Sequence, residues 1–233
     1  MYEIIPSPGT QDKEWSAIEK KIELVRSFSR TIHIDVIDGK FADNTTFSNA
    51  ASFGEYSKNL KAGGTDPFTG ESEFKFEVHL MVDNPIEHVK RWADAGFERF
   101  IGQIEKMPDQ AAFVAEAQLW GEVGLALDKD TPLDALKVHP DDLDVILVMT
   151  IKAGFSGQKL EEELLEKVKQ IREENEYMPI EVDGGINDET IEVAAAAGAT
   201  RFVTTSFLYE LGTPKEQHDL LMKKLEELKP LEK

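Results

Sequence analysis

Short runs of apolar and β-branched residues alternate with amphipathic stretches along the whole chain. Eight of these runs have the length and composition of buried strands. They lie at 3–5, 31–36, 76–81, 97–104, 122–127, 145–150, 180–182 and 201–204. The stretches between them carry helical periodicity. These predicted helices lie near 15–28, 86–95, 110–120, 133–136, 160–174, 189–197 and 215–228.

This alternation predicts the fold class. Eight strands with intervening helices in 233 residues favour α/β architecture, a (β/α)8 TIM barrel forming a single domain over residues 1–233. A doubly wound open sheet is the alternative. The segment 45–74 fits least well, because a short helix near 48–60 leads into a glycine-rich stretch at 61–70. Long βα loops are usually functional or disordered, so we expect an extended, mobile loop over or beside the site.

Four ionisable residues lie toward the ends of three of the predicted strands. Period-2 alternation places His33 and Asp35 on one face of the same strand, and His79 and Asp183 follow on two others. Active sites in barrels of this kind lie at the C-terminal strand ends, so the four side chains are expected to converge. The alternative for His33 and Asp35 is a pair of core residues that satisfy each other. The equivalent positions of His79 and Asp183 favour a shared site.

Two imidazoles and two carboxylates suit a divalent transition metal. Two carboxylates at one site also suit removal of a proton from one face of a carbon and its return on the other face. The pattern therefore predicts an epimerase.

The loops after the later strands have a composition typical of phosphate sites. Gly154 and Gly157 follow the sixth strand, and glycines let backbone N–H groups approach an oxyanion closely. The loops after strands seven and eight commonly complete such a site in barrel enzymes. They supply Gly184, Gly185, Thr205 and Ser206.

Two methionines follow strands near the predicted site. Met81 and Met149 are explained equally well as core packing or as an apolar cap against the reacting carbons. The cap would favour a flat, enediolate-like intermediate.

Composition excludes several classes of function. The chain has no cysteine, which rules out disulfides, Cys-based zinc sites and Cys nucleophiles. Its 26 basic and 45 acidic residues give a formal charge of −19, which repels nucleic acid and anionic lipid. An anionic substrate must therefore be held by local donors. Met1 leads directly into a predicted strand, and there is no long apolar span, so we expect a cytoplasmic protein without membrane association.

Four motifs, taken together, resemble ribulose-phosphate 3-epimerase. The first is His33-Ile-Asp-Val-Ile-Asp-Gly-Lys-Phe41, beside the family's His-Val-Asp-Val-Met-Asp-Gly-His-Phe. The second is His79-Leu-Met-Val82 with Pro85. The third and fourth are Val148-Met-Thr-Ile-Lys-Ala-Gly-Phe-Ser-Gly-Gln158 and Glu181-Val-Asp-Gly-Gly-Ile186. Pro6-Ser7 matches the family's first strand end, and the resemblance runs in family order from about residue 3 to residue 210.

The resemblance implies an isomerase of carbohydrate metabolism, acting in the pentose phosphate pathway on a ketose phosphate. By position, His33, Asp35, His79 and Asp183 would bind one divalent ion, reported variously as zinc, iron, manganese or cobalt. Asp35 and Asp183 would be the acid/base pair at C3, and D-ribulose 5-phosphate and D-xylulose 5-phosphate would be the leading substrate pair. Ser7 would contact the substrate. Barrels of this kind frequently form dimers or hexamers, so a homo-oligomer stays open.

The chain departs from the family's pattern around the site but at none of these four positions. Thr205 places a Cβ where a glycine backbone usually meets phosphate. The remaining departures replace a histidine, a cap methionine or a loop residue, and they are Gln103, Lys40, Ile37 and Lys152. Two alternatives therefore remain, a related epimerase on a longer sugar phosphate such as allulose 6-phosphate, and a non-catalytic barrel that binds a sugar phosphate.

Overall fold

All eight predicted strands are present in the computed structural model, which describes residues 2–62 and 74–228. The strands differ from their predicted bounds by one residue at most. They are β1 (Glu3–Pro6), β2 (Thr31–Ile37), β3 (Lys75–Met81), β4 (Phe97–Gln103), β5 (Glu122–Leu127), β6 (Val145–Met149), β7 (Ile180–Asp183) and β8 (Arg201–Thr204).

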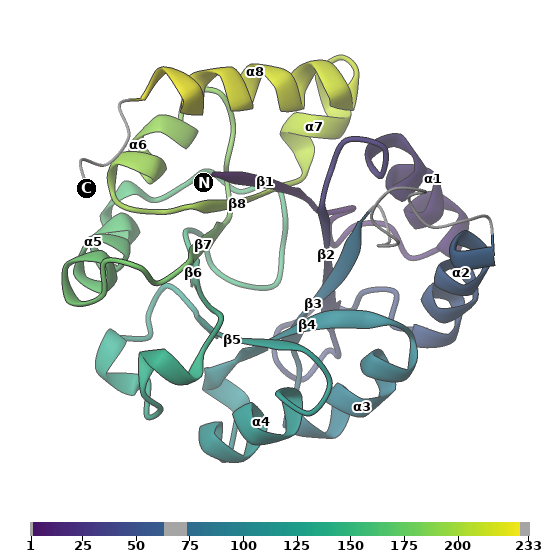
Figure 1. Ribbon diagram of the computed structural model, residues 1–233, viewed down its shortest axis with the longest axis horizontal. Coiled ribbons are helices and arrows are strands. Elements are labelled where there is room, and N and C mark those ends of the chain that lie inside the picture. The colour runs from purple at the N-terminus through teal and green to yellow at the C-terminus, as the bar shows by residue number, and fades with distance from the viewer. Residues whose placement is uncertain (1, 63–73, 229–233) are drawn as a thin grey trace.

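The strands form one parallel sheet that curves into a barrel with the helices outside it (Figure 1). Hydrogen-bonded pairing runs from β1 through β8 and back in order to β2. At the seam between β1 and β2, Thr31 donates a hydrogen bond to Glu3 (2.6 Å) and Ser7 donates one to Asp35 (3.1 Å). The (β/α)8 barrel is therefore confirmed, and the alternative of an open doubly wound sheet is wrong.

Seven of the predicted helices are found, most with shorter bounds, but the helix expected near 133–136 is only a 3₁₀ turn at Leu133–Ala135. The seven are α1 (Trp15–Val25), α2 (Ala50–Ala62), α3 (Ile86–Asp94), α4 (Gln110–Ala117), α5 (Leu165–Glu174), α6 (Ile191–Ala196) and α8 (Pro214–Glu227). A short helix α7 (Ser206–Glu210) was not predicted, because five residues are too few to show a helical period. Single 3₁₀ turns occur at Ile104–Lys106, Leu133–Ala135, Pro140–Asp142 and Glu162–Leu164.

The segment 45–74 is only partly described. Helix α2 accounts for the helix expected near 48–60. Most of the glycine-rich part of the expected loop falls within residues 63–73, which are not among the described residues. In the part of the chain that the structure describes, no helix has the length and apolar character needed to cross a membrane.

Alternation along each strand separates the barrel interior from the layer under the helices. On β6, Val145, Leu147 and Met149 belong to an apolar cluster inside the barrel, whereas Ile146 and Val148 pack in the outer core. The same period on β2 and β3 turns His33, Asp35, Glu77 and His79 inward, and contacts between these side chains confirm it. The barrel thus carries the ionisable residues on rigid strands toward one end.

Candidate metal and substrate site

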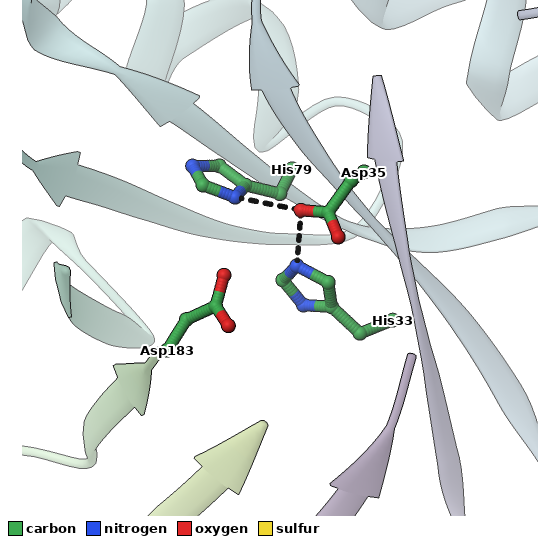
Figure 2. Close-up of side chains that lie close together, drawn as sticks. All are labelled: His33, Asp35, His79 and Asp183. Atoms are coloured by element: carbon green, nitrogen blue, oxygen red, sulfur yellow. Dashed lines mark hydrogen bonds and ion pairs between the residues drawn. The ribbon is translucent and has the colours of Figure 1, made fainter. Parts of the chain in front are cut away.

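The structure brings together the four ionisable residues that the sequence singled out. Strand β2 carries His33 and Asp35, β3 carries His79 and β7 carries Asp183. One ligand atom from each side chain lies within 4.8 Å of the ligand atoms of the others. Figure 2 shows the two imidazoles and the two carboxylates pointing toward one another from different sides of the barrel.

Asp35 connects the two imidazoles. Its Oδ1 lies 3.1 Å from His33 Nε2 and 3.2 Å from His79 Nδ1, and its Oδ2 accepts a hydrogen bond from Ser7 Oγ at 3.1 Å. The carboxylate of Asp183 faces this group but makes no hydrogen bond with any of the residues described. Its oxygens are therefore free to serve as ligands.

The local charges push the pKa values of the two carboxyl groups apart. Burial opposes the ionisation of Asp35, but the positive charge and hydrogen bonds of His33 hold its pKa well below the usual range, with a further contribution from His79. Burial and the nearby charge of Asp35 raise the pKa of Asp183 to about 7. Burial disfavours the charged imidazole of His33, yet Asp35 and the adjacent glutamates raise its pKa. Near neutral pH, one carboxyl group is held ionised while the other can exchange a proton.

Each imidazole also has a partner on its far side. His33 Nδ1 lies 2.8 Å from Glu77 Oε1, and His79 Nε2 lies 2.7 Å from Gln103 Oε1. Gln103 had been noted only as a departure from the family's histidine. The sequence analysis did not predict a role for Glu77. Its place two residues before His79, on the same face of the strand, could have indicated that it lies near the cluster.

A cavity of about 400 Å³ opens beside Asp183. The loops after β6, β7 and β8 line it, and five residues predicted to bind phosphate are among its walls: Gly157, Gly184, Gly185, Thr205 and Ser206. Gly185 has φ +68°, and a Cβ there would lie 2.2 Å from the backbone nitrogen of Leu160. Only glycine fits this close approach, so the loop backbone itself faces the cavity.

The predicted substrate contact Ser7 and the predicted phosphate-binding residue Gly154 lie elsewhere. Ser7 is fully buried at Asp35, and Gly154 is not part of the cavity wall. Gly154 instead accepts a hydrogen bond from the side chain of Asn44 at 2.8 Å, and a Cβ on it would meet Ala42. The loop after β6 is thereby tied to the loop after β2.

The remaining predicted residues occupy the surroundings of the site. Met81 and Met149 are buried in the apolar cluster inside the barrel. Thr205 packs against the backbone of Gly9, since a Cβ added to Gly9 would lie 2.5 Å from the Thr205 methyl group.

The two lysines at which the chain departs from the family's pattern are exposed. Lys40 pairs with Asp83 at 3.4 Å, and Lys152 lies on the loop after β6.

The donor set fits a divalent ion. Two imidazole nitrogens and carboxylate oxygens on separate strands are ligands that first-row transition metals accept. The Asp183 carboxylate, which has no partner among the described residues, completes the set. Cysteine is absent from the chain, so oxygen and nitrogen donors must suffice.

Comparison with known proteins assigns the family. The sequence profile of the Ribulose-phosphate 3 epimerase family matches residues 8–209. The chain is 30% identical over 212 residues to ribulose-phosphate 3-epimerase of Schizosaccharomyces pombe, covering 90% of this chain and 89% of the relative. It is 33% identical over 210 residues to the cytoplasmic isoform of Oryza sativa subsp. japonica, covering 87% and 86%.

Among solved structures, KGPDC from Streptococcus mutans superposes with a TM-score of 0.71 at 11% identity, over 97% of this chain and 98% of that one. This likeness concerns the fold alone. The family profile and the two sequence relatives span the strands that carry the cluster as well as the loops around the cavity. The chain therefore belongs to the ribulose-phosphate 3-epimerase family and is an enzyme of the isomerase class.

Proposed function

We propose that this epimerase inverts C3 of a ketose phosphate, interconverting D-ribulose 5-phosphate and D-xylulose 5-phosphate, with a divalent ion held by His33, Asp35, His79 and Asp183. The observation that carries the proposal is the convergence of these four side chains within 4.8 Å, next to a cavity lined by backbone glycines. Membership of the family supports the same reaction.

Asp35 and Asp183 are the acid/base pair in this proposal. They belong to strands β2 and β7 and face each other across the cluster (Figure 2). One carboxylate removes the C3 proton to give an enediolate, and the other carboxyl group returns a proton to the opposite face. In the metal-free site the pKa of Asp35 is held low and that of Asp183 is raised to about 7, so the two carboxyl groups differ in their affinity for a proton. A bound divalent ion supplies positive charge that favours negative charge on the C2 oxygen.

Other residues bind and shield the substrate. Backbone N–H groups around Gly157, Gly184 and Gly185 hold the phosphate, which the charge of −19 would otherwise repel. Ser7 orients Asp35 through its hydrogen bond and lies within reach of a substrate bound at that carboxylate. Met81 and Met149 form an apolar wall that limits access of water to the reacting carbons.

The test is deuterium incorporation at C3 of D-ribulose 5-phosphate in heavy water, with metal-loaded and chelated protein in parallel. We expect exchange and formation of D-xylulose 5-phosphate only in the metal-loaded sample. Exchange that survives complete chelation would remove the metal from the mechanism.

The same assay separates the alternatives. Faster turnover of allulose 6-phosphate than of D-ribulose 5-phosphate would identify the longer sugar phosphate as the substrate. It would bind in the cavity whose wall includes Thr205. Metal-loaded protein that binds sugar phosphate but exchanges no C3 proton on either compound would show that neither is the substrate of this epimerase.

A further inference from the structure

A buried carboxylate lies directly behind one of the two imidazoles. His33 Nδ1 is 2.8 Å from Glu77 Oε1, while His33 Nε2 faces Asp35 in the cluster. His33 and Glu77 have no exposed side-chain surface. An ionised carboxylate only accepts hydrogen bonds, so Nδ1 must carry the proton of this contact. Nε2 faces the ionised Asp35, so without a metal it carries hydrogen as well. When a divalent ion takes the place of that hydrogen, the ring keeps hydrogen on Nδ1 and directs the Nε2 lone pair into the cluster.

Glu77 is itself held in place by an arginine. Arg99, whose side chain is 1% exposed, donates from Nη1 to Glu77 and from Nε to Glu122 at 2.7 Å. His33, Glu77, Arg99 and Glu122 are successive register partners on β2, β3, β4 and β5. Burial opposes ionisation of Glu77, but the positive charge of Arg99 holds its pKa below the usual range. The carboxylate therefore has both a fixed charge and a fixed orientation.

A second carboxylate nearby lacks these supports. Glu181 Oε1 lies 3.5 Å from His33 Nδ1, and neither of its oxygens has a hydrogen-bond partner among the residues that the structure describes. Burial and the charge of Glu77 raise its pKa. Glu181 is equally inaccessible to solvent and lies beside the same ring nitrogen, which makes it a matched control for Glu77.

The second imidazole presents the opposite nitrogen to the cluster. His79 faces Asp35 with Nδ1, and its Nε2 lies 2.7 Å from the amide oxygen of Gln103. The two rings thus need different tautomers to bind one ion, and each has an acceptor on the nitrogen that must carry hydrogen. Only the acceptor of His33 is charged.

We propose that Glu77, clamped by Arg99, is a positioning residue that fixes the tautomer and ring orientation of His33 so that Nε2 is available to the divalent ion. The inference rests on the metal site of the proposed function. Glu77 does not touch the ion or the substrate in this role. Acceptors behind metal-binding histidines typically contribute about 10–100-fold to metal affinity.

A second ion held by His33 Nδ1, Glu77 and Glu181 is the competing use of the same atoms. The guanidinium of Arg99 already supplies the positive charge beside Glu77, and an additional cation there would repel it. We therefore expect one ion per chain. Two ions per chain, with one lost on replacing Glu77, would overturn the positioning role.

The first experiment measures Zn²⁺ affinity and stoichiometry of the metal-free full chain by competition with a chromogenic chelator. We expect Glu77→Gln to weaken binding about 10–100-fold, and Glu181→Gln to change it less than about three-fold. Unchanged affinity in Glu77→Gln overturns the positioning role and leaves the metal site standing. Absence of Zn²⁺ binding in the unsubstituted protein removes the metal site itself.

The second experiment needs no variant, and so it is independent of whether Glu77→Gln folds. Nitrogen-15 NMR of histidine side chains in the Zn²⁺-loaded protein reports which ring nitrogen carries hydrogen. We expect hydrogen on Nδ1 of His33 and on Nε2 of His79. Hydrogen on Nε2 of His33 in the loaded protein would contradict the proposal.

Discussion

The two sides of the barrel interior are packed in different ways. On β6, the inward residues Val145, Leu147 and Met149 are all apolar and buried together. On β2 and β3, the central inward positions instead carry ionisable residues. They include His33 of the cluster and Glu77, which contacts His33 from behind. Bulky branched residues usually dominate the interior of such barrels, so the β6 side is the ordinary one.

The difference shows what each side contributes. The apolar side gains stability in proportion to the area that it removes from water, and it tolerates changes of shape. The ionic side bears a desolvation cost that its mutual attraction only partly offsets. In return, His33, Glu77 and His79 are each held in one orientation by a partner on the next strand. We interpret the β6 side as contributing mainly to the stability of the fold. The β2–β3 side fixes the positions of the side chains that form the site.

The largest contrast is expected in catalysis. Asp183→Asn removes one of the two proposed proton carriers, so epimerisation should fall by about 10²–10⁴-fold. Leu147→Met, a volume-conserving change on the apolar side, should alter the rate only slightly. The measurement is kcat on D-ribulose 5-phosphate for both variants at equal metal loading. Substantial turnover by Asp183→Asn would show that this carboxylate is not an obligatory proton carrier.

The next contrast concerns stability. Arg99→Met leaves Glu77 buried without its ion-pair partner, and we expect the free energy of unfolding to fall by about 3–5 kcal/mol. Leu147→Ala, which opens a cavity on the apolar side, should cost a similar amount, about 2–5 kcal/mol. Urea denaturation of the metal-free proteins measures both. An Arg99→Met variant as stable as the unsubstituted protein would show that the ionic side is not held by this pair.

On the β2–β3 side, a double variant separates the stability of the fold from the orientation of His33. Glu77→Leu combined with Arg99→Met removes both charges, so most of the stability lost in Arg99→Met should return. Zn²⁺ affinity should stay low, because His33 Nδ1 has lost its acceptor. Recovery of both properties would contradict the division of roles between the two sides.

Stability should depend on pH through the ionisable cluster, here through Asp183 on β7, whereas the inward residues of β6 have no titratable group. Burial and Asp35 raise the folded pKa of Asp183 from 3.8 to about 7, so the native state binds this proton more tightly than the unfolded state. Its contribution is present below the unfolded pKa and is lost as pH rises through about 7. In metal-free protein, Tm of the unsubstituted chain minus Tm of Asp183→Asn should therefore decrease between about pH 4 and pH 7. Calorimetry that shows a constant difference would contradict the raised pKa.

The same two sides explain how far sequence reasoning could reach. Period-2 alternation and the common direction of parallel strands were enough to predict eight strands and the convergence of His33, Asp35, His79 and Asp183. The contact from Glu77 to Arg99 depends on the register between β3 and β4, which a single strand's pattern does not specify. The packing of Thr205 on Gly9 likewise joins two loops far apart in sequence.

The smallest effect is expected at Thr205, at the edge of the cavity. Its methyl group packs on Gly9, and its Cβ narrows the approach to the loop backbone. In Thr205→Gly, the backbone can come closer to phosphate, so KM for D-ribulose 5-phosphate should fall several-fold while kcat changes little. Thr205→Ser keeps the Cβ and the hydroxyl but removes the methyl group, and it should resemble the unsubstituted protein. Equal losses in kcat and kcat/KM for Thr205→Gly would mean that the loop after β8 also positions the carboxylates. That loop would then contribute to the chemical step as well as to phosphate binding.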